Sequence, residues 1–340
     1  MNESTIMPTL DAVQGFINKN PPADPPRMPD KIGVSSIGLA CKSLKHYHWA
    51  KVLGKQEETP AMREGTQLHM LTLEPEKFYA SYCTDLDLPE NKLVLKTVED
   101  LSNFLNERGF KPKGKKSDLI QMVRNIADPE TVLIYDDWLD TETRNKDFIP
   151  KAKWTALHEM RNSILAHDYM RTHLPNARKE VEIEGELAGI KIRGRLDFIV
   201  DDPSLPFVLV MDLKKCRSAE YWPLHYLIKD NKYHVQAALY VKMVEEKYKK
   251  PCLFVWLFTE GSAPYITECY ECDAQMAEAG LIIATQAIKR MVKAYETNSW
   301  PGYTEGRVNH MSLPEAEYAR ADDIERMMAN VEPDYGDGKI

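Results

Sequence analysis

Three segments that follow one another along the chain carry carboxylates of a type and spacing suited to metal-dependent chemistry. The segment GRLD ends at Asp197, and DLK places Asp212 two residues before Lys214. Upstream, KEVEIEGEL contains Glu180, with Glu182 as an alternative for the same role. Buried carboxylates at close quarters repel one another unless a cation lies between them. Oxygen ligands of this kind suit Mg²⁺, for which Mn²⁺ can substitute.

The spacing of apolar residues predicts that these acids lie on neighbouring strands, at about 179–185, 189–200 and 207–214. On the second strand, the apolar residues expected to share one face are Ile190, Ile192, Leu196 and Phe198, and the charged residues expected to share the other are Lys191, Arg193, Arg195 and Asp197. Lys214 is expected on the same face as Asp212. There its amine could orient or deprotonate a metal-bound water, or stabilise negative charge that develops during the reaction.

Helices must hold these strands in place. Helical periodicity predicts a mainly helical segment at 31–78 and helices at 151–174, 231–248 and 274–296. A further pair of strands is expected at 252–258 and 263–272. Strands flanked by helices, without regular βαβ alternation, predict an α/β fold with a small central mixed sheet.

The composition is that of an ordinary globular protein. The chain has 340 residues, of which 43% are hydrophobic and 28% charged. Six cysteines without a regular spacing favour a reducing compartment, and we expect a cytoplasmic protein because no targeting signal or membrane-spanning run is visible. The net charge of −8 counts only weakly against a nucleic-acid partner, since local patches and bound ions decide such contacts.

The order of these motifs resembles the core of the PD-(D/E)xK nucleases. AMREGTQLHMLTLEPEKF (61–78) resembles the G-x-x-x-H segment of RecE-type exonucleases (exonuclease VIII) and RecB-like nucleases. YHVQAALY (233–240) resembles the Q-x-x-x-Y helix of the same group and of lambda exonuclease. VSSIGLACKSLKHYH (34–48) is similar to the opening of the RecE-type domain. The resemblance covers roughly residues 31–80 and 175–312.

This resemblance implies roles for individual residues. The positions that match metal ligands are His69, Glu180, Asp197, Asp212 and the peptide carbonyl of Leu213. Lys214 matches the catalytic lysine, and Gln236 and Tyr240, one helical turn apart, can face the same groove. Arg193 and Arg195 are expected to contact the DNA backbone near the scissile bond. Two Mg²⁺ ions in each site would activate a water and stabilise both the attacking and the leaving oxygen.

Residues 92–127 differ from the rest of the chain in charge, with eight basic and four acidic residues in an otherwise acidic protein. LKTVEDLSNFLNERGFKPKGKKSDLIQMV (95–123) resembles a SAP motif, a DNA-binding unit of two helices. The lysines expected to contact phosphates at the start of its second helix are Lys111, Lys113, Lys115 and Lys116. A solvated basic loop is the alternative interpretation.

The expected divisions are a flexible N-terminal arm (1–30), the first part of a nuclease domain (31–91), a SAP-like insertion (92–127), the nuclease core (128–315) and a C-terminal tail (316–340). The resemblance implies an exonuclease that degrades one strand of linear double-stranded DNA in the 5′→3′ direction. The remaining 3′ overhang would serve a single-strand annealing protein of the RecT type in phage or prophage recombination. The resemblance also implies a ring-shaped homo-oligomer around the duplex.

Two other interpretations stay open. CYEC (269–272), together with Cys41, is similar to the cysteines of RecB-like nucleases that carry a [4Fe–4S] cluster. Such a cluster needs four thiolates, and Cys252 is the only other candidate nearby. The second alternative is a DNA-end-binding protein whose nuclease core is inactive, although the complete set of acids and lysine argues against it.

Overall fold

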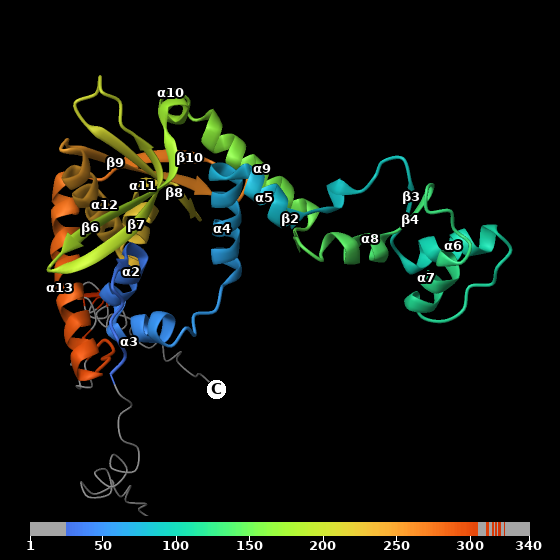
Figure 1. Ribbon diagram of the computed structural model, residues 1–340, viewed down its shortest axis with the longest axis horizontal. Coiled ribbons are helices and arrows are strands. Elements are labelled where there is room, and N and C mark those ends of the chain that lie inside the picture. Colours follow the sequence, from blue (N-terminus) through green and yellow to red (C-terminus); the bar gives the residue numbers. More distant parts are fainter. Residues whose placement is uncertain are drawn as a thin grey trace, which may run out of the picture.

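The computed structural model describes residues 25–304 and the separate positions 311, 312, 315, 317, 319, 320 and 323. Most of the predicted arm (1–30) and tail (316–340) therefore lies outside the described residues. The described chain forms a central six-stranded sheet with helices on both sides, and a smaller helical unit at the end of an arm (Figure 1). The predicted α/β class with a mixed central sheet is confirmed.

Helices supply most of the N-terminal part. The elements are β1 (Ile32–Gly33), α2 (Val34–Lys42), α3 (Leu44–Tyr47), the π-helical turn η1 (His48–Val52), α4 (Pro60–Leu73) and α5 (Pro75–Ser81). Helix α4 begins at Pro60 because the Thr59 hydroxyl accepts a hydrogen bond from the Met62 N–H, and a proline in the first turn has no N–H to satisfy. It ends before Pro75, since a proline disfavours helical backbone in the residue that precedes it.

The chain then leaves the main body and returns. The elements of this excursion are β2 (Tyr82–Cys83), η2 (Asp85–Asp87), β3 (Leu93–Leu95), α6 (Val98–Glu107), α7 (Lys116–Arg124), β4 (Val132–Ile134), α8 (Tyr135–Glu142) and β5 (Asp147–Phe148). Strands β3 and β4 pair in parallel and enclose α6 and α7, which pack around a core of their own that includes Leu105 and Leu119. Two short helices thus lie where the sequence resembles a SAP motif. Strand β4, beyond residue 127, was not predicted.

The C-terminal half supplies the sheet. Its elements are α9 (Lys151–Ala166), α10 (Asp168–His173), η3 (Leu174–Asn176), β6 (Arg178–Leu187), β7 (Ile190–Val200), β8 (Val208–Cys216), α11 (Tyr221–Asn231), α12 (Tyr233–Tyr248), β9 (Cys252–Glu260), β10 (Thr267–Glu271) and α13 (Ala274–Thr297). The single helix predicted at 151–174 is divided at His167, whose extended backbone and ring Nδ1 cap α10 through the Tyr169 N–H. Helix α11 was not predicted; its Pro223 lies in the first turn, where proline is tolerated.

Strand β7 pairs with three other strands, β1, β6 and β8. The strand order is β1-β7-β8-β9-β10, and β6 pairs with the other edge of β7. On their shared edge, β1 lies opposite Ile192 and Arg193, whereas β8 lies opposite residues 198–200. Between these two contacts, residues 194–197 of β7 pair with no strand on that edge within the described residues. The sheet therefore has an internal gap in its hydrogen bonding.

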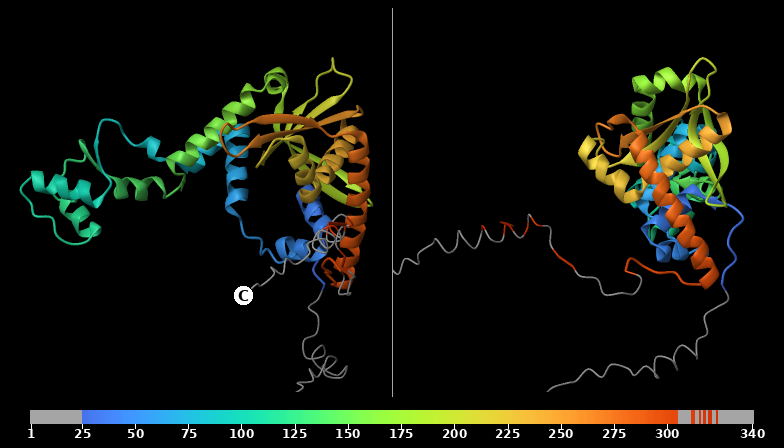
Figure 2. Two further views of the ribbon diagram at one scale, coloured as in Figure 1. Left: turned by 180° about the vertical axis from the view of Figure 1, so that it is seen from behind. Right: turned by 90° about the vertical axis from the view of Figure 1, so that its left-hand side faces the viewer.

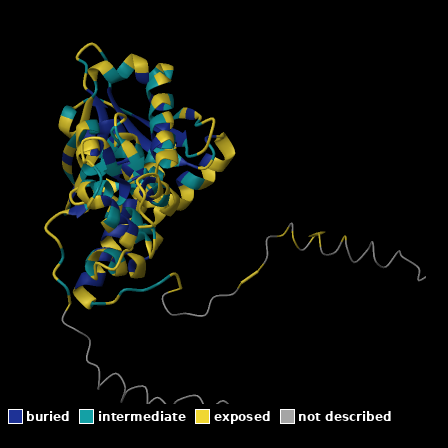
Figure 3. Cartoon of the chain, turned by 90° about the vertical axis from the view of Figure 1, so that its right-hand side faces the viewer, coloured by how far each residue is buried: buried dark blue, intermediate teal, exposed yellow. Residues whose placement is uncertain are grey.

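The two faces of the sheet bury two separate cores. On β9, Phe254, Trp256 and Phe258 enter the core formed with α2, α12 and α13, whereas Val255 and Leu257 enter the core formed with α4 and α9. These helix layers lie on opposite sides of the sheet in Figure 2, and buried residues concentrate between them in Figure 3. No helix in the described part of the chain combines the length and apolar character needed to cross a membrane.

The face prediction for β7 is wrong at one position. Phe198 was expected beside Leu196, but Leu196 packs in the core with α12 while Phe198 packs in the core with α4. The alternation changes at Asp197 and at the facing residue of β6, Glu180, whose backbone is left-handed with φ of 53°. The two strands pair on either side of this level but not at it. A local break in the pleat therefore exchanges the faces of both strands.

The gap predicts that Gly194 tolerates no side chain. A Cβ at this position would lie 2.3 Å from Cε1 of Tyr240, so Gly194→Ala forces the ring or the strand to move. We expect the free energy of unfolding, measured by urea denaturation, to fall by about 1–3 kcal/mol. Gly38→Ala is the matched control, because its Cβ would meet nothing within 4 Å and helical alanine is favoured over glycine. Equal stability of the two variants would contradict this packing.

Candidate active site

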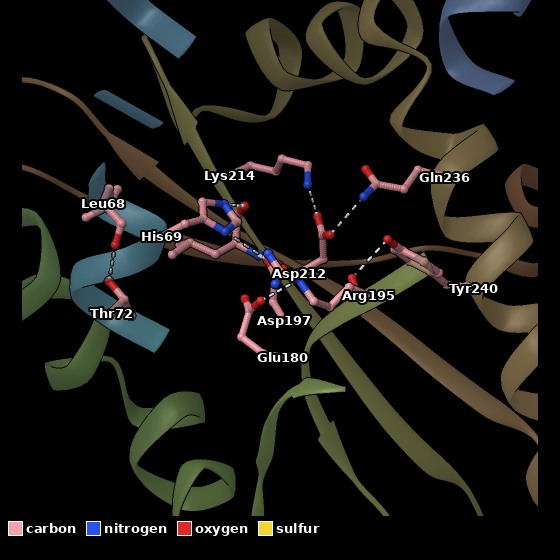
Figure 4. A network of polar contacts seen from close by, with 11 residues as sticks. Leu68, His69, Thr72, Glu180, Arg195, Asp197, Asp212, Lys214, Gln236 and Tyr240 are labelled. Carbon is pink, nitrogen blue, oxygen red and sulfur yellow. Dashed lines mark hydrogen bonds and ion pairs between the residues drawn. The ribbon is translucent and has the colours of Figure 1, made fainter. Parts of the chain in front are cut away.

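A cavity of about 270 Å³ opens at the level where the pleat breaks (Figure 4). The predicted site residues that line it are His69 from α4, Glu180 from β6, Arg195 and Asp197 from β7, Asp212 and Lys214 from β8, and Gln236 and Tyr240 from α12. Predicted residues that are far apart in the chain, from His69 to Tyr240, are thereby brought to one place. The sheet supplies the acids and the lysine, and one helix from each layer covers them.

Asp197 takes the place of a missing strand partner. Its Oδ2 accepts a hydrogen bond of 2.7 Å from the Leu213 N–H of β8, at the level where the backbones of β7 and β8 no longer pair. Only 8% of Asp197 is exposed, and this burial raises the pKa of its carboxyl. The ring of His69 opposes that rise in pKa, while the carboxylate of Asp212 adds to it.

Asp212 and Lys214 form a buried ion pair on β8. Asp212 is 2% exposed, and its Oδ1 accepts a hydrogen bond of 3.2 Å from the Gln236 amide. Burial alone would lower the pKa of the Lys214 ammonium, but the carboxylates of Asp212 and Asp197 together raise it above its ordinary value. Lys214 is therefore protonated at neutral pH. In this state it can orient a water or stabilise negative charge, but it cannot remove a proton.

Glu180 faces Asp197 from the neighbouring strand. The Nε of Arg195 lies 2.5 Å from its Oε2, and burial raises the pKa of this carboxyl although Arg195 opposes the change. A left-handed backbone costs a glutamate on the order of 1 kcal/mol, and such strain is concentrated at functional sites. Glu182, the alternative for the same role, lines a different cavity.

His69 joins α4 to the strands that carry the acids. Its Nε2 donates a hydrogen bond of 2.6 Å to the Leu213 carbonyl, and its Nδ1 lies 3.6 Å from Asp197 Oδ2. The carbonyl predicted as a metal ligand therefore already has one partner. A carbonyl oxygen has two lone pairs, so this hydrogen bond leaves the second lone pair available.

Tyr240 fills the gap along β7. Its hydroxyl donates a hydrogen bond of 3.0 Å to the Arg195 carbonyl, and its ring lies against Gly194. Burial raises the pKa of the Tyr240 hydroxyl to about 12, so it stays protonated and keeps this hydrogen bond. Gln236, one turn earlier on α12, holds Asp212. Gln236 thus positions the Asp212 carboxylate, and Tyr240 positions strand β7.

The remaining predicted residues lie elsewhere. Arg193 lines a neighbouring cavity of about 660 Å³, which shares Arg195 and Tyr240 with the site. In the distant helical unit, Lys111, Lys113 and Lys115 are exposed, whereas Lys116 lies 2.7 Å from Asp136 in an ion pair. Four further residues line the site and were not predicted from the sequence, namely Thr66, Met70, Glu74 and Lys77. Thr66 could have been found, because it lies three residues before His69 on α4 and therefore shares its face.

The donor atoms of the site suit a divalent cation in their chemistry. Within the described part of the chain, no three His, Cys, Asp or Glu side chains are arranged as ready ligands of a metal ion. Glu180 Oε2 and Asp212 Oδ2 are nevertheless buried without a hydrogen bond, although each lies within ion-pair distance of a basic side chain. Buried acceptor oxygens with unused capacity fit Mg²⁺ or Mn²⁺, which are hard cations that prefer oxygen ligands.

The cysteines do not support an iron–sulfur centre. All six lie in the described range and have free thiols, and no three of them gather as possible metal ligands. Cys269 instead lies with its sulfur 3.5 Å from the Nδ1 of His167. Because a [4Fe–4S] cluster needs four thiolates, these residues do not fit the group.

The chain belongs to the family described as a PDDEXK-like domain of unknown function (DUF3799), whose model matches residues 40–311. The assignment of the sequence motifs to the PD-(D/E)xK nucleases is thereby confirmed at the level of this class. Nucleases with this core generally depend on divalent metal ions. A comparison with curated proteins found no match.

Two solved structures are distantly similar. A protein from Eubacterium rectale described as "Putative exonuclease" shares 12% identity, covers 85% of this chain and 92% of its own, and gives a TM-score of 0.48. SSO0001 shares 16% identity, covers 67% of this chain and 85% of its own, and gives a TM-score of 0.25. Likenesses this distant add nothing to the assignment of an activity.

Because the pKa of Asp197 is raised in the folded protein, ionisation of this carboxyl should lower the free energy of unfolding as the pH rises. A carboxyl whose pKa is raised by folding loses its stabilising contribution as the pH rises from the ordinary value of 3.8 through the folded value. In EDTA, we therefore expect Asp197→Asn to unfold at a higher urea concentration than wild type at pH 8, with little difference at pH 4.

Asp202→Asn is the matched control. Hydrogen bonds from Ser204 lower the pKa of Asp202, so its contribution has the opposite sign and is present above the ordinary value. We expect this variant to be no more stable than wild type at pH 8. A stability difference between Asp197→Asn and wild type that is independent of pH would contradict the assignment.

Proposed function

We propose that the protein is a metal-dependent exodeoxyribonuclease that degrades one strand of linear double-stranded DNA from its ends. The observation that carries this proposal is the convergence of Asp197, Asp212 and Lys214 in one cavity at the break in β7. Membership of the PDDEXK-like family supports a nuclease. Two buried acids beside a protonated amine suit hydrolysis of a phosphodiester, whose transition state gains negative charge on oxygen.

Mg²⁺ is the proposed cofactor, with Mn²⁺ as a substitute and two ions in each site. The groups proposed to hold them are the side chains of His69, Glu180, Asp197 and Asp212 and the carbonyl of Leu213. When bound, the metal would supply positive charge to the attacking and leaving oxygens. Lys214 then orients the attacking water and stabilises the charge that develops on the phosphate. Arg195 pairs with Glu180 in this structure and would be available to the DNA backbone if Glu180 held the metal, and Arg193 would contact the backbone from the neighbouring cavity.

The finer features of the function rest on the resemblance to RecE-type exonucleases. We propose 5′→3′ degradation that leaves a 3′ overhang, which a single-strand annealing protein of the RecT type then binds during phage-type homologous recombination. A ring-shaped homo-oligomer would keep the enzyme on its duplex. We propose that the natural host is a phage or prophage, and that the enzyme works in the bacterial cytoplasm.

The smaller helical unit formed by β3, α6, α7 and β4, which we call the inserted unit, is proposed to bind duplex DNA. Support comes from the exposed side chains of Lys111, Lys113 and Lys115, which surround the turn at Gly114 between α6 and α7. Within the described residues these three lysines form no ion pair. Contacts from such a turn to phosphates add affinity without reading the base sequence.

The nuclease proposal predicts the effect of single substitutions. On linear duplex labelled at the 5′ or the 3′ end and supplied with Mg²⁺, wild type should release the 5′ label first, as mononucleotides. Asp212→Ala removes a proposed metal ligand and Lys214→Ala removes the charge that stabilises the transition state. We expect each to lower the cleavage rate by at least about 10²-fold.

Lys215→Ala is the matched control for Lys214→Ala. This neighbouring lysine pairs with Glu64 at 3.2 Å and does not line the cavity, so its variant should cleave at close to the wild-type rate. Intact DNA after incubation of wild type with Mg²⁺ or Mn²⁺ would leave only the end-binding alternative. Release of the 3′ label first would reject the proposed direction.

The insertion proposal predicts a salt effect. Replacing Lys111, Lys113 and Lys115 together by Gln should weaken duplex binding in EDTA, and the slope of log affinity against log salt should fall by about 0.9 for each phosphate that the variant no longer neutralises. Lys92→Gln is the control, because this lysine binds the Pro129 carbonyl at 2.8 Å. Unchanged affinity in the triple variant, measured by fluorescence anisotropy, would reject the insertion as a DNA-binding unit.

A further inference from the structure

Helix α11 carries aromatic side chains on the face where a surface helix normally carries charge. Its inner face is apolar, with Leu224 and Ile228 buried in the core. The outer face presents Tyr221, Trp222 and Tyr226, which are 60%, 67% and 57% exposed, and His225 lies exposed among them. We call these four residues the aromatic face of α11. Packing of α11 onto the protein does not explain these exposed aromatic side chains, since the helix packs through its opposite side.

Neighbouring rings of this face contact one another edge to face. The centroid of Trp222 lies 5.2 Å from that of Tyr221 and 6.1 Å from that of His225, and Tyr226 lies 5.7 Å from His225. The ammonium of Lys229 lies 5.3 Å from the ring of Tyr226. A row of rings with a cation at one end is the arrangement on which successive bases of a single strand stack.

The aromatic face is connected to the active site. Helix α11 follows β8, the strand of Lys214, and packs beside α12, the helix of Gln236 (Figure 1). Its last residues, Asp230 and Asn231, line a hollow of about 270 Å³ together with Lys232 and Gln236. Gln236 also holds Asp212 in the active site. The hollow therefore shares Gln236 with the candidate active site and reaches the end of α11, one helical turn from Tyr226.

We propose that the aromatic face of α11 binds single-stranded DNA by base stacking and holds a strand that has separated from the duplex beside the active site. This inference rests on the proposed nuclease function and adds to it a contact with a single strand. Arg217 and Lys232 flank the two ends of the helix and form no ion pair with the described residues, which suits a phosphate backbone. The acids of this region include Glu220, Asp230 and Glu260. Asp230 pairs with Lys229 at 3.7 Å, and Glu260 accepts the Ala219 N–H at 2.9 Å.

The test uses the full-length protein in EDTA, so that no strand is cut. A fluorescein-labelled single-stranded oligothymidylate is the probe, and its affinity is measured by anisotropy. Replacing Trp222 and Tyr226 together by Ala should weaken binding at least about tenfold, because the bases no longer have rings on which to stack. Replacing both by Phe keeps the rings and should leave the affinity within about twofold of wild type. Tyr303→Ala, which removes a ring that is 70% exposed elsewhere, should have no effect.

A photochemical experiment locates the contact without any substitution. An oligonucleotide that contains 5-iodouracil is cross-linked to the wild-type protein, which is then digested with trypsin. Cleavage after Arg217 and Lys229 releases residues 218–229 as one peptide that contains all four rings. We expect the cross-link in this peptide. A cross-link confined to other peptides would overturn the proposal, whatever the folding of the alanine variant.

The outcome is separable from that of the nuclease proposal. If wild type cleaves duplex ends in Mg²⁺ but the double alanine variant binds the single strand as tightly as wild type does, the role of α11 is rejected and the nuclease stands. A loss of binding to a partner protein, with single-strand affinity unchanged, would likewise reject it. If wild type cuts no DNA but the peptide 218–229 is cross-linked, the nuclease proposal fails and the strand contact is retained.

Discussion

The whole site depends on how the edge of β7 is satisfied where no strand pairs with it. Buried N–H and C=O groups must find partners, and at this gap one carbonyl of β7 and one N–H of β8 find side chains. The carboxylate of Asp197 accepts the Leu213 N–H, and the hydroxyl of Tyr240 donates to the Arg195 carbonyl. Residues proposed for catalysis thus replace the hydrogen bonds of a sheet. The break in strand pairing opens the cavity, and side chains that line the cavity make hydrogen bonds at the break.

Charge balance is the second constraint on this arrangement. The carboxylates of Asp197 and Asp212 are buried on adjoining strands, where His69 lies beside the first and Lys214 pairs with the second. Removing one partner of the Asp212–Lys214 pair leaves an uncompensated buried charge, which is far more destabilising than the loss of an exposed ion pair. A divalent cation bound here would add positive charge beside carboxylates that Lys214 already partly neutralises. The raised pKa of Lys214 follows from the same balance and favours its role as a cation.

The sequence specified the chemistry of the site better than its geometry. The motif order predicted His69, Asp197, Asp212 and Lys214, because each stands at a recognisable position in a strand or helix that periodicity also predicts. It did not predict the exchange of faces at Asp197, since that depends on the left-handed backbone of Glu180 and a glutamate gives no signal of it. Helix α11 was missed for a related reason. Its proline and its aromatic outer face both depart from the pattern of an amphipathic surface helix, so only tertiary packing reveals it.

The chain carries a net charge of −8, yet a DNA substrate is compatible with it because positive charges that form no ion pair with the described residues are grouped in one part of the inserted unit. In the inserted unit, acids of α8 pair with the basic residues nearest to them, as Asp136 does with Lys116 and Asp137 with Arg124. The positive charge that remains is therefore concentrated at the turn between α6 and α7. At the site, the acids are buried within the sheet and offset locally. Net charge sums over both regions and hides this separation, whereas a DNA strand meets only the charges within about 10 Å of it.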